Sequence, residues 1–165
     1  MVKKISCNWS LARRNFFKSI NSILGSLGHN PPIDTILTLA KSKCFSVLSY
    51  GIASMPLSPI DVRYFTFAFN SLFCKLFKTN SVDIIEQCQY YTYCWPFYAY
   101  YDFLRVCFLF DKFKLGLLVF NNSFDRSDID ELFILKAKYK LQLSDSKYHI
   151  KCKMWRVIES TLTPS

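Results

Sequence analysis

Apolar residues recur along the chain at intervals of three and four, the spacing that places them on one side of an α-helix. Residues 10–27 carry the first such stripe, with basic and polar residues on the opposite side. Gly28 and then Pro31 and Pro32 interrupt the pattern, because glycine closes helices and proline cannot continue one. The first stretch therefore predicts an amphipathic helix with a basic outer side.

The same spacing predicts further helices at about 33–50, 59–78, 82–90, 96–115, 127–143 and 147–162. Ser58, Pro59 and Asp61 form a strong start signal, because a serine cap, a proline in the first turn and an early acid all favour helix initiation. The helix over 96–115 is apolar on nearly all sides and is expected to be central. Only residues 2–7 could form a strand. The predicted class is all-α, an irregular bundle of about six or seven helices.

Composition favours a folded, reduced chain. Of the 165 residues, 51% are hydrophobic and 18% aromatic, with only 4 Gly, which is typical of a packed core. The 7 cysteines are an odd number with no short paired spacing, so we expect no disulfide framework and an intracellular location, nucleus or cytoplasm not being distinguished. No secretory signal opens the chain, and five charges within residues 96–120 argue against a membrane helix.

Basic residues outnumber acidic ones by 21 to 12, a net charge of +9. Such an excess favours an anionic partner, either nucleic acid or an anionic membrane surface, although it could also serve solubility alone. Several basic groups lie on predicted outer helix faces, where they could follow a phosphate backbone. The aromatic cluster over residues 90–101 could stack nucleic-acid bases or fill the core.

Residues for catalysis or metal binding are sparse. The only histidines are His29 and His149, and Cys88 and Cys94 do not have the spacing of a common zinc site. There is no pair of adjacent aspartates and no glycine-rich phosphate loop. The acidic group at residues 125–131 is explained by a helix start. We therefore expect no catalytic, metal or cofactor site.

Three stretches, taken in order, carry a family resemblance. They are residues 12–19 with Asn21 and 23–25, residues 41–44 with 47–48 and 50–51, and residues 69–70 with 75–79, followed by residues 88–89 and Pro96. Together they resemble the region that follows the catalytic palm in non-LTR retrotransposon (LINE-type) reverse transcriptases, over about residues 5–113.

In that family this region is similar to a polymerase thumb, a helical bundle that grips the backbone of the template–primer duplex. The resemblance implies a thumb-like region over residues 1–120, with 121–165 as a helical extension packed on it, and RNA, DNA or an RNA–DNA hybrid as the partner. The palm aspartates are missing, which implies a truncated fragment without polymerase activity of its own. Asn70 matches the pattern without an assigned role. The candidate backbone contacts are Arg13, Arg14, Lys18, Lys41, Lys43, Lys75 and Lys78.

Two alternatives remain open at this point. The chain could be a helical interaction module that docks, through an exposed aromatic face, on a protein taking the place of the missing palm. It could also be a non-functional remnant, because a bundle separated from its palm exposes surface that was buried.

Overall fold

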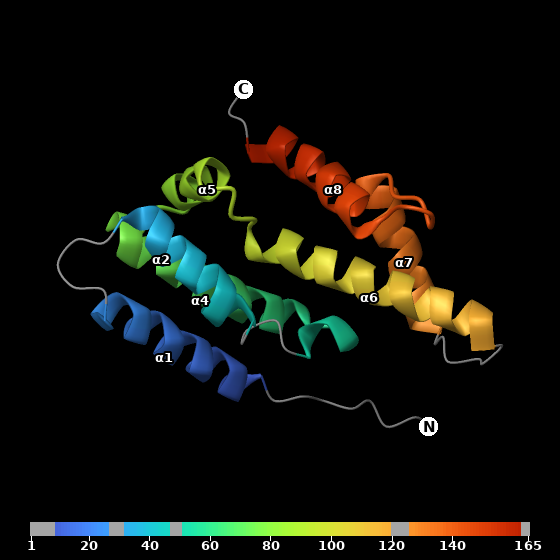
Figure 1. Ribbon diagram of the computed structural model, residues 1–165, viewed down its shortest axis with the longest axis horizontal. Helices are drawn as coiled ribbons and strands as arrows, with labels where there is room; N and C mark the ends of the chain where they lie inside the picture. Colours follow the sequence, from blue (N-terminus) through green and yellow to red (C-terminus); the bar gives the residue numbers. More distant parts are fainter. Residues whose placement is uncertain (1–8, 27–31, 47–50, 120–125, 163–165) are drawn as a thin grey trace. The chain divides into compact units, whose positions relative to one another are not determined.

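The computed structural model of the chain describes residues 9–26, 32–46, 51–119 and 126–162, and within these ranges it is all-α with no strand (Figure 1). This confirms the predicted fold class, while residues 2–7, the candidate strand, lie outside the described residues. A π-helical turn, η1 (Ala40–Cys44), and a 3-10 turn, η2 (Ile52–Ser54), accompany the α-helices. The α-helices are α1 (Ser10–Ser26), α2 (Ile33–Leu39), α4 (Pro59–Phe77), α5 (Val82–Tyr91), α6 (Phe97–Val119), α7 (Arg126–Tyr139) and α8 (Lys147–Leu162).

The start of α4 confirms the signal in the sequence. The Ser58 hydroxyl accepts a hydrogen bond from the Asp61 backbone N–H at 3.1 Å and donates one to the Asp61 carboxylate at 2.6 Å. Pro59 occupies the first helical position. At the other end Lys78 adopts a left-handed conformation (φ 50°), and its N–H bonds to the carbonyl of Cys74. Both ends of α4 are therefore set by local chemistry.

Three helices differ from the predictions in extent or in type. The first, α6, continues to Val119, four residues beyond its predicted end. The helix expected over residues 33–50 is α-helical to Leu39 and then widens into η1. The helix expected to reach residue 143 ends at Tyr139, because Lys140 is left-handed (φ 52°) and the Leu141 N–H bonds back to the Lys136 carbonyl at 2.9 Å. Leu141 is nevertheless buried, so its apolar character serves the core from a loop.

The chain divides into two compact units. Unit 1 comprises residues 1–50 and 57–80, and unit 2 comprises residues 51–56 and 81–165. Unit 1 thus contains α1, α2, η1 and α4, and unit 2 contains η2 and α5 to α8. The boundary expected near residue 120 falls inside unit 2, in a stretch that is not described.

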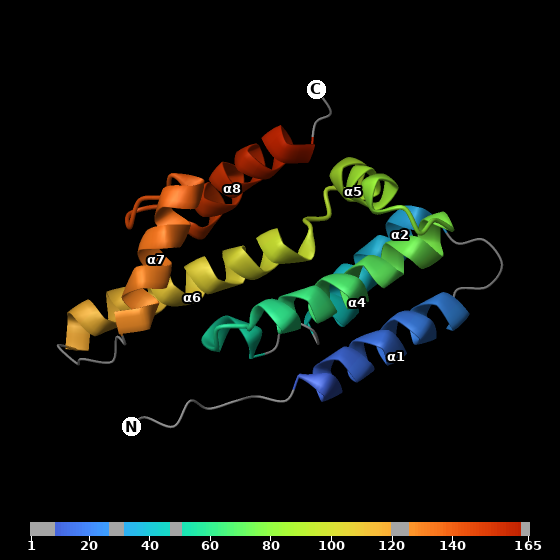
Figure 2. The same cartoon turned by 180° about the vertical axis from the view of Figure 1, so that it is seen from behind.

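In unit 1, α1, α2 and α4 lie side by side in both views (Figures 1 and 2). Their shared core is a chain of buried phenylalanine rings. The ring centroids of Phe16 and Phe45 are 6.4 Å apart, those of Phe45 and Phe69 4.4 Å, and those of Phe69 and Phe73 6.1 Å. Because Phe16 belongs to α1, Phe45 follows η1 and the other two belong to α4, this chain holds the three segments together.

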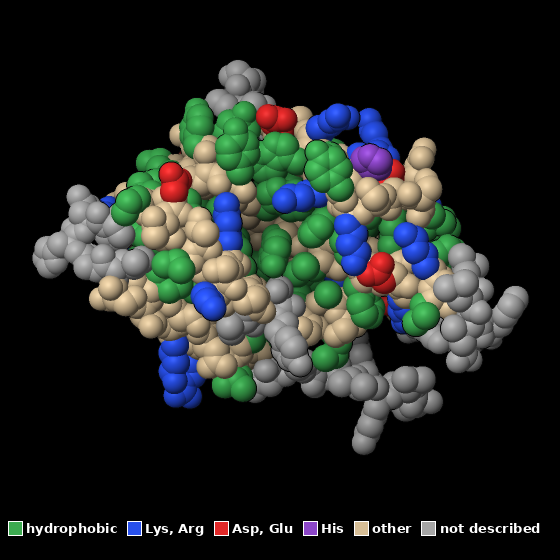
Figure 3. Space-filling view, viewed as in Figure 1, with side chains coloured by type: hydrophobic (Ala, Val, Ile, Leu, Met, Phe, Trp, Pro, Cys, Tyr) green, Lys and Arg blue, Asp and Glu red, His purple; other side chains and the backbone are tan. Residues whose placement is uncertain are grey.

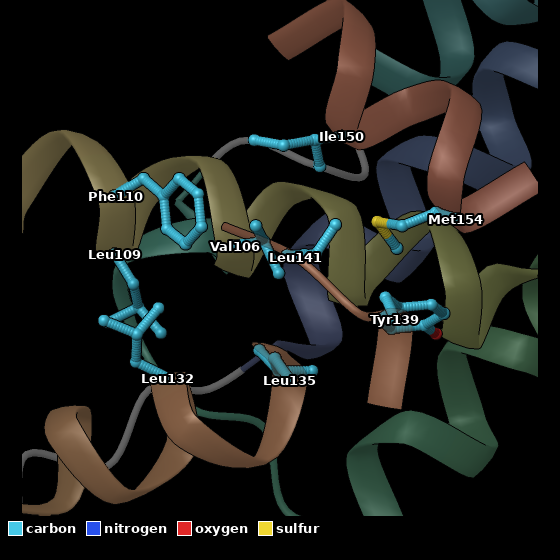
Figure 4. Close-up of a cluster of buried hydrophobic side chains, with 9 residues drawn as sticks. All are labelled: Val106, Leu109, Phe110, Leu132, Leu135, Tyr139, Leu141, Ile150 and Met154. Carbon is cyan, nitrogen blue, oxygen red and sulfur yellow. The ribbon is translucent and has the colours of Figure 1, made fainter. Parts of the chain in front are cut away.

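In unit 2, α6 packs against α7 and α8, and the side chains between them form a mostly aliphatic cluster (Figure 4). The expectation that α6 is central is confirmed for this unit, since its residues Val106, Leu109 and Phe110 are buried in that cluster. No helix in the described ranges is long and apolar enough to cross a membrane. The six cysteines within those ranges are all free.

Candidate nucleic-acid interface

The two units carry different amounts of charge. Among described residues, unit 1 has eight basic and two acidic side chains, a net charge of +6, and unit 2 has eleven and nine, a net charge of +2. All seven candidate contacts predicted from the sequence lie in unit 1. Within the described part of unit 1 the charged residues are Arg13, Arg14, Lys18, Lys41, Lys43, Arg63, Lys75 and Lys78, with Asp34 and Asp61 as the acids.

In unit 2 much of the positive charge is paired with acids of the same unit. Five of its eleven basic side chains form ion pairs with acids of the same unit. These pairs are Arg105 with Asp128 and Glu131, Lys112 with Asp128, Lys138 with Asp102, Lys147 with Asp111, and Lys153 with Asp145.

Arg105 is the centre of this pairing. Its side chain is fully buried on α6, where it donates to the Ala53 carbonyl at 2.8 Å and to both carboxylate oxygens of Glu131. Burial by itself lowers the pKa of the guanidinium, but the hydrogen bonds and charge of Glu131 outweigh it and the pKa is raised. The network therefore ties η2, α6 and α7 into one unit.

The sequence pattern did not indicate that Asp128 and Glu131 are partners of Arg105. Asp128 does lie in the first turn of α7, as the helix-start interpretation expects. However, its carboxylate also lies 3.5 Å from Arg105 and 2.5 Å from Lys112. An arginine within a nearly all-apolar helix was the available signal, because a buried cation needs an acidic partner.

In unit 1 the outer side of α1 presents Arg14 and Lys18 to solvent. One helical turn separates these two exposed side chains, and neither forms an ion pair with any residue the structure describes. Arg13 turns toward α4, and its guanidinium carbon lies 4.5 Å from the centre of the Tyr64 ring. The Arg13 Nε is buried and has no hydrogen-bond partner among described atoms. No described acid therefore neutralises the positive charge of Arg13, Arg14 and Lys18 on α1.

The C-terminal end of α4 adds Lys75 and Lys78. The Lys75 ammonium donates to the Asn21 side-chain oxygen at 2.6 Å, which joins the two helices near their C-terminal ends. Arg13 and Tyr64 join them near their N-terminal ends. The two helices therefore run in the same direction along one surface of unit 1.

We name this surface the α1–α4 face. Arg13 and Lys75 take part in the contacts between the two helices, and Arg14, Lys18 and Lys78 are exposed on the same helices or at the end of α4. In Figure 3 basic side chains project where α1 lies in Figure 1. Lys41 and Lys43 are exposed on η1, and the contacts that define the face do not include them. The face consists of Leu11, Arg13, Arg14, Lys18 and Asn21 on α1 with Ile60, Arg63, Tyr64, Phe67, Lys75 and Lys78 on α4 or its end.

Arg63 was not among the candidates, although it is exposed on α4 and forms no ion pair within the described residues. Its signal in the sequence was its position: it lies four residues before Phe67, which places the two side chains next to each other on a helix surface. The candidates taken from the sequence, Lys75 and Lys78, lie at the C-terminal end of α4, whereas Arg63 lies near its start.

The aromatic cluster at residues 90–101 fills space within unit 2 for the most part. Phe97 and Tyr101 are buried, and the rings of Tyr90 and Trp95 stack against Trp155 at centroid distances of 6.3 Å each. Tyr91 and Tyr93, however, are 77% and 75% exposed, so core packing accounts for the buried rings of this cluster and not for these two. Among the described residues no group of acids, histidines and cysteines could hold a metal ion.

Comparison with known proteins does not place the chain in a family. No protein-family model, curated protein or solved structure matches it.

Proposed function

We propose that unit 1 binds the phosphate backbone of nucleic acid through the α1–α4 face. The observation that carries this proposal is the excess of basic side chains on that face together with their lack of acidic partners. Arg14, Lys18, Arg63 and Lys78 form no ion pair among the described residues, so their charge is available to an anionic ligand. Unit 2, by contrast, uses five basic side chains internally.

A polyanion gains from such a surface because lysine and arginine displace the counterions condensed along it. Contacts of this kind hold the backbone and do not require side chains that recognise base edges. Binding is therefore expected to tolerate changes of sequence and to weaken steeply as salt is added. RNA, DNA and RNA–DNA hybrids all offer the required charge.

The resemblance to the region after the palm of non-LTR retrotransposon reverse transcriptases supports the same role. Under this proposal the chain is a thumb-like fragment of such an element, without polymerase activity of its own. Arg13, Arg14, Lys18, Lys75 and Lys78 belong to the stretches that carry the resemblance, whereas Arg63 does not.

The test is fluorescence anisotropy of a labelled RNA–DNA hybrid with two matched triple variants. Arg14→Glu, Lys18→Glu and Lys78→Glu together reverse charge on the α1–α4 face. The control reverses Lys114, Lys151 and Arg156, three exposed basic residues of unit 2 with no described ion pair. Both variants change the net charge equally. We expect the first to weaken binding by about tenfold or more and the control by much less. Equal losses would contradict the proposal.

A second candidate function, a protein-interaction module, is favoured by α7. Phe133 and Ile134 are 64% and 66% exposed on its outer side, and Ile129, four residues before Phe133, is also exposed. Changing Phe133 and Ile134 to Glu would abolish self-association or partner binding measured by light scattering if this candidate is correct. A monomeric wild-type chain that binds no hydrophobic dye would count against it.

A further inference from the structure

The α1–α4 face is not uniformly basic, because it also carries exposed rings. Phe67 is 72% exposed and Tyr64 50% exposed, and both belong to the described part of α4. They are three residues apart on one helix, which puts their Cβ atoms about 5–6 Å from each other on the same side. Two adjacent rings therefore stand in solvent on the surface assigned to the nucleic-acid backbone.

Two arginines lie next to these rings. Arg63 precedes Phe67 by four residues, and Arg13 lies over the Tyr64 ring from the neighbouring helix. Further along the same face come Lys75, held against Asn21, and Lys78. Asp61, three residues before Tyr64, is the one described acid on this part of α4, and it accepts a hydrogen bond from the Ser58 hydroxyl. The two arginines thus outnumber the acid next to the rings.

Exposed rings with flanking cations suit one class of ligand. Bases in a duplex are stacked on one another and paired, so a protein ring reaches them only at an end. Bases of a single strand have free faces that stack on aromatic side chains, while the phosphates contact nearby lysine and arginine. Since stacking requires only the face of a base, this mode of binding does not depend on sequence.

On this basis we infer that the α1–α4 face binds single-stranded nucleic acid in preference to duplex, with unpaired bases stacked on Phe67 and Tyr64. The inference rests on the proposed function and specifies its ligand. It differs from the duplex grip that the resemblance implies. A purely apolar protein partner would leave the cations around the rings without a role, whereas a single strand engages both kinds of side chain.

Phe67 is the residue for the test because it is largely exposed and its removal leaves no cavity in the core. The matched control is Phe133, which is 64% exposed on a helix of unit 2. Phe67→Tyr serves as the ring-retaining variant. Arg13 contacts Tyr64, so substituting Tyr64 would change two features at once and is a poorer test.

The measurement compares the anisotropy of labelled 12-mer oligo(dT) and oligo(U) with that of a duplex of the same length at one salt concentration. We expect the single strands to bind more tightly than the duplex. Phe67→Ala should weaken their binding by about tenfold and leave duplex binding nearly unchanged. Phe67→Tyr and Phe133→Ala should bind as the wild type does.

Other outcomes distinguish a failure of the stacking inference from a failure of the proposed function. If single strands and duplex bind equally and Phe67→Ala has no effect, the stacking inference is wrong while the proposed function stands. If a folded chain binds neither ligand, the proposed function fails and the inference with it. If Phe67→Ala converts a dimer to a monomer without changing nucleic-acid affinity, the rings belong to a protein interface and the inference is overturned.

Discussion

The two units of the chain use charge in opposite ways. In unit 2 a fully buried arginine and four lysines are paired with acids, and the net charge of the described residues is only +2. In unit 1 the core consists of phenylalanine rings, and a net charge of +6 lies around it with two acids present. Among the described residues, the basic excess is therefore concentrated in unit 1, where Arg14, Lys18, Arg63 and Lys78 form no ion pair.

Removing a ring from the core of unit 1 should have the largest effect on stability. Phe69 is buried and contacts both Phe45 and Phe73. Phe69→Ala is expected to lower the free energy of unfolding by about 4 kcal/mol, because the cavity adds to the lost burial. Urea denaturation measures the loss of unfolding free energy. In hydrogen exchange, the backbone amides of α1 and α4 should lose protection first. An equal loss of protection in α6 to α8 would contradict the division into two units.

Breaking the charge network of unit 2 should have the next largest effect. Arg105→Met keeps much of the buried volume but removes the cation paired with Glu131, while Asp128 keeps its pair with Lys112. We expect a loss of about 3 kcal/mol, near the low end for a broken buried pair because both acids are partly exposed. Nucleic-acid affinity of the folded variant should remain that of the wild type. A drop in affinity at unchanged folding would show that unit 2 takes part in binding.

A smaller effect is expected at Asp145, in the loop before α8. Its carboxylate accepts the Gln142 N–H at 2.7 Å and pairs with Lys153, and these contacts outweigh burial, so the pKa of Asp145 is lowered. Because the folded-state pKa lies below the ordinary value of about 3.9, the contribution is present above that pH and is lost as pH falls through the folded-state pKa. Asp145→Asn should cost about 1 kcal/mol at pH 7.

Thermal unfolding of the wild type and Asp145→Asn at pH 7 and pH 3 tests this prediction. The two midpoints should differ at pH 7 and move closer together at pH 3. A difference that grows on acidification would mean that the carboxylate is not stabilised by its partners.

The helices were predictable because their signals are local. The stripe over residues 10–27 and the cap at Ser58 depend only on neighbouring residues, and both agree with α1 and α4. The end of α7 was not predictable, because Lys140 takes the left-handed conformation without being glycine and the apolar Leu141 and Leu143 prolong the pattern beyond it. In that stretch a loop packs into the core of unit 2, and its apolar residues continue the apolar pattern of α7 although they are not part of the helix.

The candidate site was predictable in part. The sequence identified basic residues on outer helix faces, and Arg13, Arg14, Lys18, Lys75 and Lys78 meet on the α1–α4 face as described above. It could not show that Asn21 and Lys75 join two helices, since these residues are far apart in the chain. The helical spacing did place Phe69 on the buried stripe of this helix and leave Phe67 off it, and the structure agrees, with Phe69 buried and Phe67 72% exposed.

The central claim concerns where the binding charge lies, and the salt dependence of affinity tests it most directly. Binding of a labelled oligo(dT) would be measured from about 50 to 200 mM salt for the wild type, for the Arg14→Gln, Lys18→Gln, Lys78→Gln variant, and for the control that replaces Lys114, Lys151 and Arg156 with Gln. We predict that the slope of log affinity against log salt becomes shallower by about two in the first variant and stays unchanged in the control. An unchanged slope in the first variant, or an equal change in both, would contradict the account.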